Sequence, residues 1–389
     1  MDVLNAPLTP EEWERYQRQL LLPQVGVEGQ RKLRQSAVLV VGAGGLGLPV
    51  ISYLAAAGVG RMVVMDGDRV EWSNLHRQVM FRSDDVGQSK AEVAAREAGR
   101  LNPLIRVEYI NGFFDTLTGP AAVSGCTWLA DCTDNFASRY QINDVCVHAG
   151  IPFVSGAVQG DELQVAVLNR NGGGTYRCLF PEPPSPEQAP PCQQAGILGT
   201  VAGMAGMLMA HELLQLLLDA AAAPRSYLIA GHLLTHSFQR MEIPCDQHAV
   251  RSLKQRPLAH PDTYRHWCAQ QYSNQTVREL SSEDLIAMYR NEPVVLLDVR
   301  EESERADSLS SDLWIPFGEL MRRAEEIPKH QKVVLYCSVG YRSYMAVQRL
   351  QERFGFSNLY HLKGGLSSAS EADRHALAAY RVADRIPAR

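Results

Sequence analysis

The sequence predicts an α/β protein with two folded parts: a first domain built on a mostly parallel sheet and a smaller α/β domain after it. Three observations support this prediction. A short β-branched run leads through a glycine-rich turn into an apolar helix, the 389 residues exceed one ordinary domain, and strands alternate with helices again after residue 276. Hydrophobic residues make up 46% of the chain and charged residues 21%, which is the balance of a globular protein and not of a disordered one.

The first strand–helix–strand unit lies near the N-terminus. Residues 37–41 are a β-branched run, residues 42–47 a glycine-rich turn, residues 46–57 a helix rich in Ala and Leu, and residues 62–65 a second strand. Because such a crossover joins parallel strands, the unit predicts a Rossmann-like sheet with helices on its faces. We also expect a helix at residues 11–22 and strands at residues 106–110, 128–131, 153–156 and 164–168.

Changes in periodicity predict the domain boundaries. We assign residues 1–248 to the first domain, residues 249–275, which are polar and without a regular period, to a linker, and residues 276–389 to the second domain. The Gly- and Pro-rich residues 172–191 predict an irregular surface segment. In the second domain we expect helices at residues 282–289, 317–327 and from residue 342, and strands at residues 294–299 and 332–336.

Charge and hydropathy narrow the classes of partner. The net charge is −5 and no basic stripe is evident, so we expect no nucleic-acid partner and no docking on an anionic membrane. The apolar residues 195–210 fall short of a membrane span and predict a buried helix. Residues 1–19 lack the layout of a signal peptide, and the eight cysteines show no disulfide spacing, so we expect a cytoplasmic protein with reduced thiols.

A glycine pattern predicts a nucleotide site. Gly42, Gly44 and Gly47 form G-x-G-x-x-G between a strand and a helix, with Gly45 inside the pattern, where missing side chains let backbone amides approach phosphates. Asp66 closes the second strand 19 residues after Gly47, where a carboxylate can accept hydrogen bonds from ribose hydroxyls. On these residues alone an NAD-dependent dehydrogenase fits as well as an ATP-binding enzyme.

Later segments separate these two readings. The sequence D-G-D-R-V-E-W-S-N-L-H-R-Q occupies residues 66–78, Lys90 follows, and D-C-T-D-N-F-A-S-R occupies residues 131–139. These motifs, in this order, resemble the adenylation domain of ubiquitin-activating-type enzymes. More narrowly, the chain resembles the fused molybdopterin-synthase adenylyltransferase/sulfurtransferase family over nearly its whole length.

The resemblance implies that ATP and Mg²⁺ activate the C-terminal carboxylate of a small ubiquitin-like sulfur carrier that ends in Gly-Gly. Attack of a carboxylate on the α-phosphate brings anion toward anion, so cations and a metal must neutralise the phosphates. Arg77 and Lys90 are the candidate cations, and Asp134 is the candidate Mg²⁺ ligand.

By the same resemblance, further residues complete the nucleotide site. Asp66 binds the ribose, Asn74 and Gln78 help form the phosphate site, and Arg18 reaches the triphosphate of the other subunit in a homodimer.

A second site is predicted around Cys337. The sequence Y-C-S-V-G-Y-R-S follows a β run and leads into a helix, so backbone amides and a helix N-terminus surround the thiol and stabilise its anion. This loop resembles the active-site loop of rhodanese domains, and residues 298–300 and 362–366 resemble that family's flanking segments. Four residues separate Cys337 from Arg342, one fewer than in the related phosphatases, which favours sulfur transfer with Cys337 as the nucleophile.

Two further predictions concern the other cysteines. Cys192 resembles a mobile-loop cysteine that attacks or resolves the activated carrier, although a structural thiol remains an alternative. Many members of the family carry a structural zinc on two Cys-x-x-Cys pairs, of which only Cys178, Cys245 and His248 remain as possible ligands here. Because a structural zinc site uses four ligands, we expect no tightly bound zinc.

The function we expect is ATP-dependent adenylation of the carrier's C-terminal glycine, followed by sulfur transfer from a Cys337 persulfide to form a thiocarboxylate. A carrier-binding rhodanese sulfurtransferase without adenylation activity is the alternative, and a dehydrogenase is a third. The pathway served remains open between molybdopterin, thiamine, tRNA thiolation and secondary metabolites. The sulfur donor also remains open between thiosulfate and a cysteine desulfurase.

Overall fold

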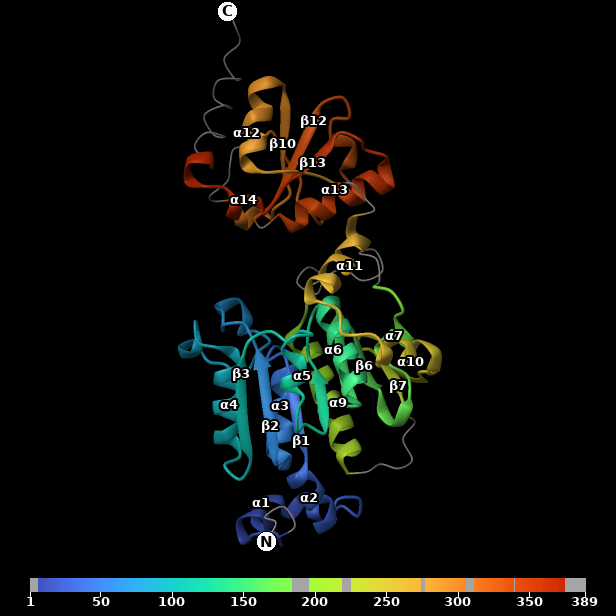
Figure 1. The fold of residues 1–389 in the computed structure, drawn as a ribbon. Helices are drawn as coiled ribbons and strands as arrows, with labels where there is room; N and C mark the ends of the chain where they lie inside the picture. The colour runs from blue at the N-terminus through green and yellow to red at the C-terminus, as the bar shows by residue number, and fades with distance from the viewer. Residues whose placement is uncertain are drawn as a thin grey trace, which may run out of the picture. The chain divides into compact units, whose positions relative to one another are not determined.

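The computed structural model describes residues 6–183, 196–218, 225–273, 277–305, 311–338 and 340–374 (Figure 1). The chain divides into two compact units, Met1–Tyr272 and Ser273–Arg389. Each unit is an α/β structure with its own sheet, as the sequence predicts.

The sheet of the first unit has eight strands in the order β3-β2-β1-β4-β5-β6-β7-β8. Strands β3, β2, β1, β4 and β5 pair in parallel, and strands β5, β6, β7 and β8 form an antiparallel meander. The strands are β1 (Ala37–Val41), β2 (Arg61–Asp66), β3 (Arg106–Asn111), β4 (Trp128–Asp131), β5 (Phe153–Gln159), β6 (Glu162–Leu168), β7 (Tyr227–His232) and β8 (Ser237–Glu242).

The predicted strands β1 to β6 are confirmed, whereas β7 and β8 were not predicted. Strand β1 is buried at all five residues, as expected for a central parallel strand covered on both faces. Strand β8 is exposed at all six residues and lies at the edge of the sheet, so burial imposes no apolar alternation on its sequence.

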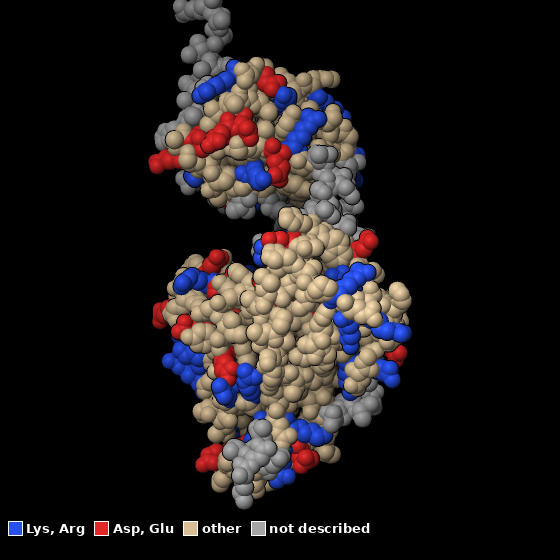
Figure 2. Space-filling model, viewed as in Figure 1, with Lys and Arg blue, Asp and Glu red and all other residues tan. Residues whose placement is uncertain are grey.

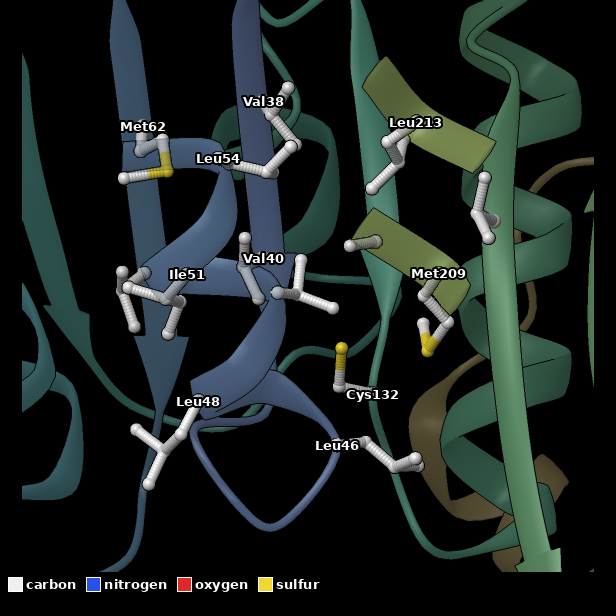
Figure 3. Close-up of a cluster of buried hydrophobic side chains, with 14 of the residues drawn as sticks. Val38, Val40, Leu46, Leu48, Ile51, Leu54, Met62, Cys132, Met209 and Leu213 are labelled. Carbon is white, nitrogen blue, oxygen red and sulfur yellow. The ribbon is translucent and has the colours of Figure 1, made fainter. Parts of the chain in front are cut away.

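Helices cover both faces of this sheet and enclose two hydrophobic cores. One core packs side chains of α3, α4 and α9 against the strands, and Figure 3 shows Val38, Ile51 and Met209 within it. The other core contains side chains of α6 and α11. The helices are α1 (Pro10–Leu20), α2 (Gly26–Gln35), α3 (Gly47–Ala57), α4 (Lys90–Leu101), α5 (Gly119–Ala122), α6 (Phe136–Ala149), α7 (Tyr176–Leu179), α9 (Gly199–Leu217), α10 (Gln247–Gln255) and α11 (Pro261–Ser273).

Helix α9 is long and apolar enough, by length and composition, to cross a membrane. It packs on α3, β5 and β6, and its buried residues belong to the core, which agrees with the predicted buried helix. On the face of the first unit drawn in Figure 2, a broad uncharged area lies between groups of basic and acidic side chains.

The stretch expected to be a linker differs from that expectation. Residues 249–275 contain most of α10 and all of α11, and α11 packs on the first unit. The hydroxyl of Tyr264 donates to the carboxylate of Asp144 at 2.7 Å, and the guanidinium of Arg177 lies 4.9 Å from the ring of Trp267. Tyr264, Trp267 and Cys268 are spaced three and four residues apart, so a helical period is present but short and surrounded by polar residues.

The second unit has a five-stranded parallel sheet in the order β11-β10-β12-β13-β9. Its strands are β9 (Arg278–Leu280), β10 (Val294–Asp298), β11 (Leu313–Trp314), β12 (Lys332–Tyr336) and β13 (Leu359–Leu362), and its helices are α12 (Ser282–Asn291), α13 (Tyr341–Phe354) and α14 (Gly365–Ser368). Two clusters of buried hydrophobic residues pack on this sheet.

The prediction of a helix at residues 317–327 is wrong. The chain there forms successive turns and one short 3₁₀ helix, Ala324–Glu326. Leu320, Ala324 and Ile327 are buried at the i, i+4, i+7 spacing of a helix, but several backbone bonds run between residues three apart, as in Arg322 to Glu319. Tight turns therefore bury the same apolar side chains that suggested an α-helix.

The packing of α11 on the first unit can be tested through the hydrogen bond between Tyr264 and Asp144. We expect Tyr264→Phe to lose the hydrogen bond to the buried carboxylate of Asp144, which lowers stability by about 2 kcal/mol and the melting temperature of the first unit by about 5 °C. Tyr53→Phe is the matched control, because the Tyr53 side chain lies on α3 and is 51% exposed. Calorimetry of the full chain measures both, and equal melting of the two variants would contradict the packing of α11.

Candidate active site

The glycine-rich loop after β1 meets the loop after β4 at the point where the strand order reverses. Gly42 has φ = 95°, and a Cβ there would lie 2.8 Å from the carbonyl oxygen of Cys132. A Cβ on Gly47 would lie 1.9 Å from the carbonyl oxygen of Gly42. Only glycine fits either position, so the predicted pattern corresponds to a real close approach of backbones.

Helix α9 supports this loop from behind. A Cβ on Gly206 would lie 2.4 Å from the carbonyl oxygen of Leu46, and a Cβ on Gly199 would lie 2.5 Å from that of His76. The sequence motifs do not include these two glycines. Gly199, Ala202 and Gly206 share one helical face, and that row of small residues is the signal that could have indicated a close backbone contact.

A pocket of about 860 Å³ opens beside these loops, a volume within the range of small-molecule sites. The structure brings nine of the predicted residues together in its wall: Gly42, Gly44, Gly45, Asp66, Asn74, Arg77, Gln78, Lys90 and Asp134. Gly47 begins α3 and does not line the pocket. Arg18 is exposed on α1, next to Gln19, which donates to the carbonyl of Ala57 at the far end of α3.

Asp66 stabilises the loop as well as facing the pocket. One carboxylate oxygen accepts from the backbone N–H of Ala43 at 2.7 Å, and the other accepts from that of Asp68 at 2.8 Å. Burial raises the pKa of Asp66, while these two hydrogen bonds oppose the shift. A carboxylate fixed in this way keeps further lone pairs for hydroxyl donors in the pocket.

Lys90 reaches the pocket from the first turn of α4. Ser89 caps this helix by accepting from the backbone N–H of Glu92, which orients the first turn. The Lys90 side chain is only 9% exposed, and its Nζ lies 3.0 Å from a carboxylate oxygen of Asp68. Asp68 was not predicted, although it sits two residues after Asp66 in the same motif.

The segment after β2 carries three further predicted residues. Arg77 donates from Nη1 to the carbonyl of Ser73 at 3.0 Å, and Asn74 accepts from the backbone N–H of Glu71 at 3.1 Å. Gln78 is 3% exposed, and its Oε1 has no hydrogen-bond partner within the described part of the chain. A buried amide oxygen of this kind is available to a donor bound in the pocket.

Asp134 is exposed in the loop after β4, and Asn135 caps α6 directly after it. Arg139 is buried and donates to the carbonyls of Thr133 and Gly156 at 3.1 and 3.3 Å, so it positions this loop on β5. Among the described residues no cluster of three or more His, Cys, Asp or Glu could hold a metal. A cation at Asp134 would therefore need oxygen ligands from the substrate, which is the habit of Mg²⁺ in nucleotide sites.

The remaining candidate zinc ligands are only partly assembled. The side chains of Cys178 and Cys245 interact, and burial together with Cys178 raises the pKa of Cys245. His248 is exposed at the start of α10. Cys192 lies outside the described residues, so its predicted part in catalysis stays a prediction.

The second candidate site surrounds Cys337, which lies between β12 and α13 with none of its surface exposed. Its Sγ accepts from the backbone N–H of Gly340 at 3.1 Å and lies 3.7 Å from the hydroxyl of Ser343. Gly340 has φ = 84°, and a Cβ there would lie 2.6 Å from the backbone nitrogen of Gly364. The glycines of the predicted flanking segment at residues 362–366 therefore pack directly on the cysteine loop.

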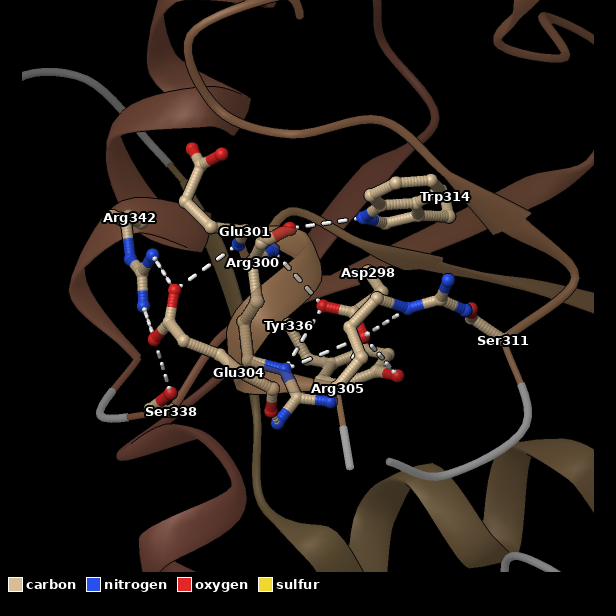
Figure 4. A network of polar contacts seen from close by, with 10 residues as sticks. All are labelled: Asp298, Arg300, Glu301, Glu304, Arg305, Ser311, Trp314, Tyr336, Ser338 and Arg342. Carbon is tan, nitrogen blue, oxygen red and sulfur yellow. Dashed lines mark hydrogen bonds and ion pairs between the residues drawn. The ribbon is translucent and has the colours of Figure 1, made fainter. Parts of the chain in front are cut away.

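Arg342, the last residue of the loop, is paired with a carboxylate that sequence analysis missed. Figure 4 shows that the carboxylate of Glu304 accepts hydrogen bonds from both terminal nitrogens of the Arg342 guanidinium, at 2.6 Å from Nη1. The same carboxylate accepts a hydrogen bond from the hydroxyl of Ser338 at 3.1 Å. The guanidinium is the largest cause that lowers the pKa of Glu304 to about 2. The loop therefore ends in an ion pair between Arg342 and Glu304.

Glu304 is itself held by a buried network. Arg300 donates from Nη1 to the backbone carbonyl of Glu304 at 2.9 Å and pairs with Asp298, also at 2.9 Å. Asp298 is fully buried and also accepts from the hydroxyl of Tyr336 (Figure 4). The predicted flanking segment at residues 298–300 thus links the core of the unit to the cysteine loop.

Comparisons with known proteins identify the family of each part of the chain. The model of the ThiF family matches residues 16–251, and the model of the rhodanese-like domain matches residues 281–372. The chain is 34% identical to the adenylyltransferase and sulfurtransferase UBA4 of Saccharomyces cerevisiae, over 93% of this chain and 89% of the relative. It is 33% identical to MOCS3 of Drosophila sechellia, named in the same way, over 93% of this chain and 84% of the relative.

A shorter relative matches part of the chain. The sulfur carrier protein adenylyltransferase of Thermus thermophilus is 45% identical over 60% of this chain and 89% of its own length. Among solved structures, the Escherichia coli MccB protein with a MccA variant is similar, with a TM-score of 0.53 and 23% identity over 63% of this chain and 74% of that chain. A likeness at that identity shows a shared fold.

The close approach at Gly47 gives a test of the first site. We expect Gly47→Ala to force the loop apart, because the new Cβ would overlap the carbonyl of Gly42, and to destabilise the protein by about 3 kcal/mol. Gly99→Ala is the control: nothing lies within 4 Å of its Cβ, and Ala in a helix is about 1 kcal/mol better than Gly. Thermal unfolding distinguishes them, and similar melting of Gly47→Ala and the unaltered protein would refute the assigned backbone contact.

Proposed function

Because the chain belongs to the ThiF family and carries a rhodanese-like domain, we propose that it adenylates the C-terminal glycine of a small ubiquitin-like sulfur carrier and then converts it to a thiocarboxylate. The observation that carries this proposal is the gathering of Arg77, Lys90 and Asp134 in one pocket beside the glycine loop. Neither a carrier-docking module without adenylation nor a dehydrogenase gives these three residues a purpose.

In the first step a carboxylate oxygen of the carrier attacks the α-phosphorus of ATP. A carboxyl–phosphate bond forms, the α–β phosphoanhydride bond breaks, and pyrophosphate leaves with the electron pair. Lys90 and Arg77 lie where they would stabilise the negative charge that accumulates on the phosphates. Asp66 and Gln78 supply acceptors for hydroxyl or amino groups of the nucleotide.

The residues present fit a Mg²⁺ ion bound together with the triphosphate. Asp134 is the carboxylate that would hold it, and the phosphates would supply further oxygen ligands. Bound there, the ion would neutralise phosphate charge. Arg18 lies outside the pocket of its own chain, which is compatible with a role across a homodimer.

In the second step the terminal sulfur of a Cys337 persulfide attacks the carbonyl carbon of the acyl-adenylate. A carbon–sulfur bond forms and AMP leaves with its oxygen. The product is a carrier joined to Cys337 through two sulfurs, and attack of a second thiolate on the Cys337 sulfur releases the carrier thiocarboxylate and leaves a protein disulfide. Cys192 is the candidate for that second thiol.

The division between the two steps predicts separable activities. Cys337→Ala should retain carrier-dependent exchange of pyrophosphate into ATP but form no thiocarboxylate, because adenylation uses only the first unit. Cys268→Ala is the control, since burial raises the pKa of that thiol to about 11 and leaves it unreactive. Radiolabel exchange and mass spectrometry of the carrier measure the two steps, and a loss of exchange in Cys337→Ala would show that the division is wrong.

A substitution in the pocket should have the complementary effect: adenylation is lost and sulfur loading is retained. Lys90→Ala should slow carrier-dependent pyrophosphate exchange about a hundredfold, because a cation facing the phosphates is lost, while Cys337 still accepts sulfur. The control Lys254→Ala removes an exposed lysine of α10, away from the pocket wall. An exchange rate for Lys90→Ala within about threefold of the control would show that Lys90 does not contact the phosphates.

A further inference from the structure

Two cysteines of the first unit differ in exposure from the other cysteines that the structure describes. Cys178 and Cys245 are partly exposed, whereas the others are buried: Cys126, Cys132, Cys146, Cys268 and Cys337. Cys178 lies in α7, Cys245 lies in the segment between β8 and α10, and neither lines the pocket beside the glycine loop. Because thiol reactivity depends on access to the sulfur, these two cysteines are open to reagents in solution.

Backbone contacts hold the segments of these two cysteines together. A Cβ on Gly174 would lie 2.8 Å from the carbonyl oxygen of Ile243, so the two segments touch there without side chains between them. Ser226 joins both segments: its hydroxyl donates to the carbonyl of Gly174 at 2.8 Å, and its carbonyl accepts from the backbone N–H of Ile243 at 3.0 Å. Cys178 follows this contact by four residues on one segment, and Cys245 follows it by two on the other.

The two side chains also meet. Cys178 and Cys245 interact with each other through their side chains, and both thiols are free. The Sγ of Cys245 accepts from Nε2 of Gln247, the first residue of α10, at 3.2 Å, and the same Nε2 donates to the carbonyl of Gly172 at 3.2 Å. Helices α7 and α10 accordingly lie side by side in Figure 1. The fold therefore presents the two thiols to each other before any bond joins them.

A zinc ion does not fit these residues. Members of the family that bind zinc carry a Cys-x-x-Cys pair in each segment, but here the second positions hold Pro181 and His248. A structural zinc site uses four ligands. In the part of the chain that the structure describes, no group of three or more His, Cys, Asp or Glu side chains could hold a metal. A disulfide bond needs only two thiols, and one remains in each segment.

We propose that Cys178 and Cys245 are a reversible modification site, at which an oxidant forms a disulfide bond between α7 and the segment before α10. The bond would close a loop of more than sixty residues. Such a loop restricts the unfolded chain, so the bond stabilises the first unit. This inference goes beyond the proposed function and holds whether or not the chain adenylates a carrier.

The oxidant we assign is a low-molecular-weight disulfide such as oxidised glutathione. The thiolate of one cysteine attacks a sulfur of the oxidant, a mixed disulfide forms, and one glutathione thiolate leaves with the electron pair of the broken bond. The thiolate of the other cysteine then attacks the protein sulfur, and the second glutathione thiolate leaves. Two protein thiols are oxidised, one small disulfide is reduced to two thiols, and the leaving thiolates take up the two protons. The second attack is intramolecular and therefore favoured by the existing contact.

The first arm of the test identifies the bond in the full chain. The reduced protein is equilibrated with oxidised glutathione, remaining thiols are alkylated, and peptides are analysed by mass spectrometry without reduction. We expect a linked peptide pair that contains Cys178 and Cys245, in protein that runs as a single chain on a non-reducing gel. Absence of this peptide pair at equilibrium would overturn the inference.

Serine variants test whether the bond needs both cysteines. Cys178→Ser and Cys245→Ser should each lose the linked pair and leave the remaining thiol joined to glutathione. Cys126→Ser is the matched control, because it makes the same replacement at a buried cysteine of the first unit and should retain the linked pair. Melting temperatures of the reduced proteins show that each variant is folded.

The second arm measures the effect of the bond on stability. Oxidation should raise the melting temperature of the first unit by about 5 °C in the unaltered protein and in Cys126→Ser, and should leave it unchanged in Cys178→Ser and Cys245→Ser. An equal rise in all four proteins, or no rise in the linked protein, would overturn the inference. One zinc ion per reduced chain that protects both thiols from alkylation would overturn it as well.

Discussion

The contact between two backbones, at Gly42 and Cys132, is the constraint on which the first site depends. The loops after β1 and β4 leave neighbouring parallel strands in opposite directions along the sheet, and they meet because glycine at residue 42 allows the approach. That meeting places the glycine loop and Asp134 in the wall of one pocket. Helix α9 then packs on this loop through Gly206 and on the segment after β2 through Gly199, so three close backbone contacts surround one pocket.

Sequence patterns predicted this pocket well because its residues lie in short motifs at the ends of successive strands. Asp66 ends β2, Lys90 begins α4 and Asp134 follows β4, and parallel strands bring their ends to one edge. The supporting residues were harder to predict. Gly199 and Gly206 act through contacts with segments far away in the sequence, and nothing in their own neighbourhood identifies those partners.

The second site shows the same limit more sharply. The loop from Cys337 to Arg342 is a local motif and was predicted, but Glu304 lies more than thirty residues earlier in a polar 3₁₀ turn. Tertiary structure makes Glu304 a partner of Arg342, because the buried ion pair of Asp298 and Arg300 holds the turn next to the loop.

The packing of α11 determines where the two activities can be separated as pieces of a gene. The hydrophobic side chains of Tyr264, Trp267 and Cys268 belong to the core of the first unit, beyond the end of the matched ThiF segment at residue 251. An exchange of sulfurtransferase modules between related enzymes would have to join them after α11 and before β9 begins at Arg278. A junction placed before α11 would separate α11 from the core of the first unit and expose apolar surface to water.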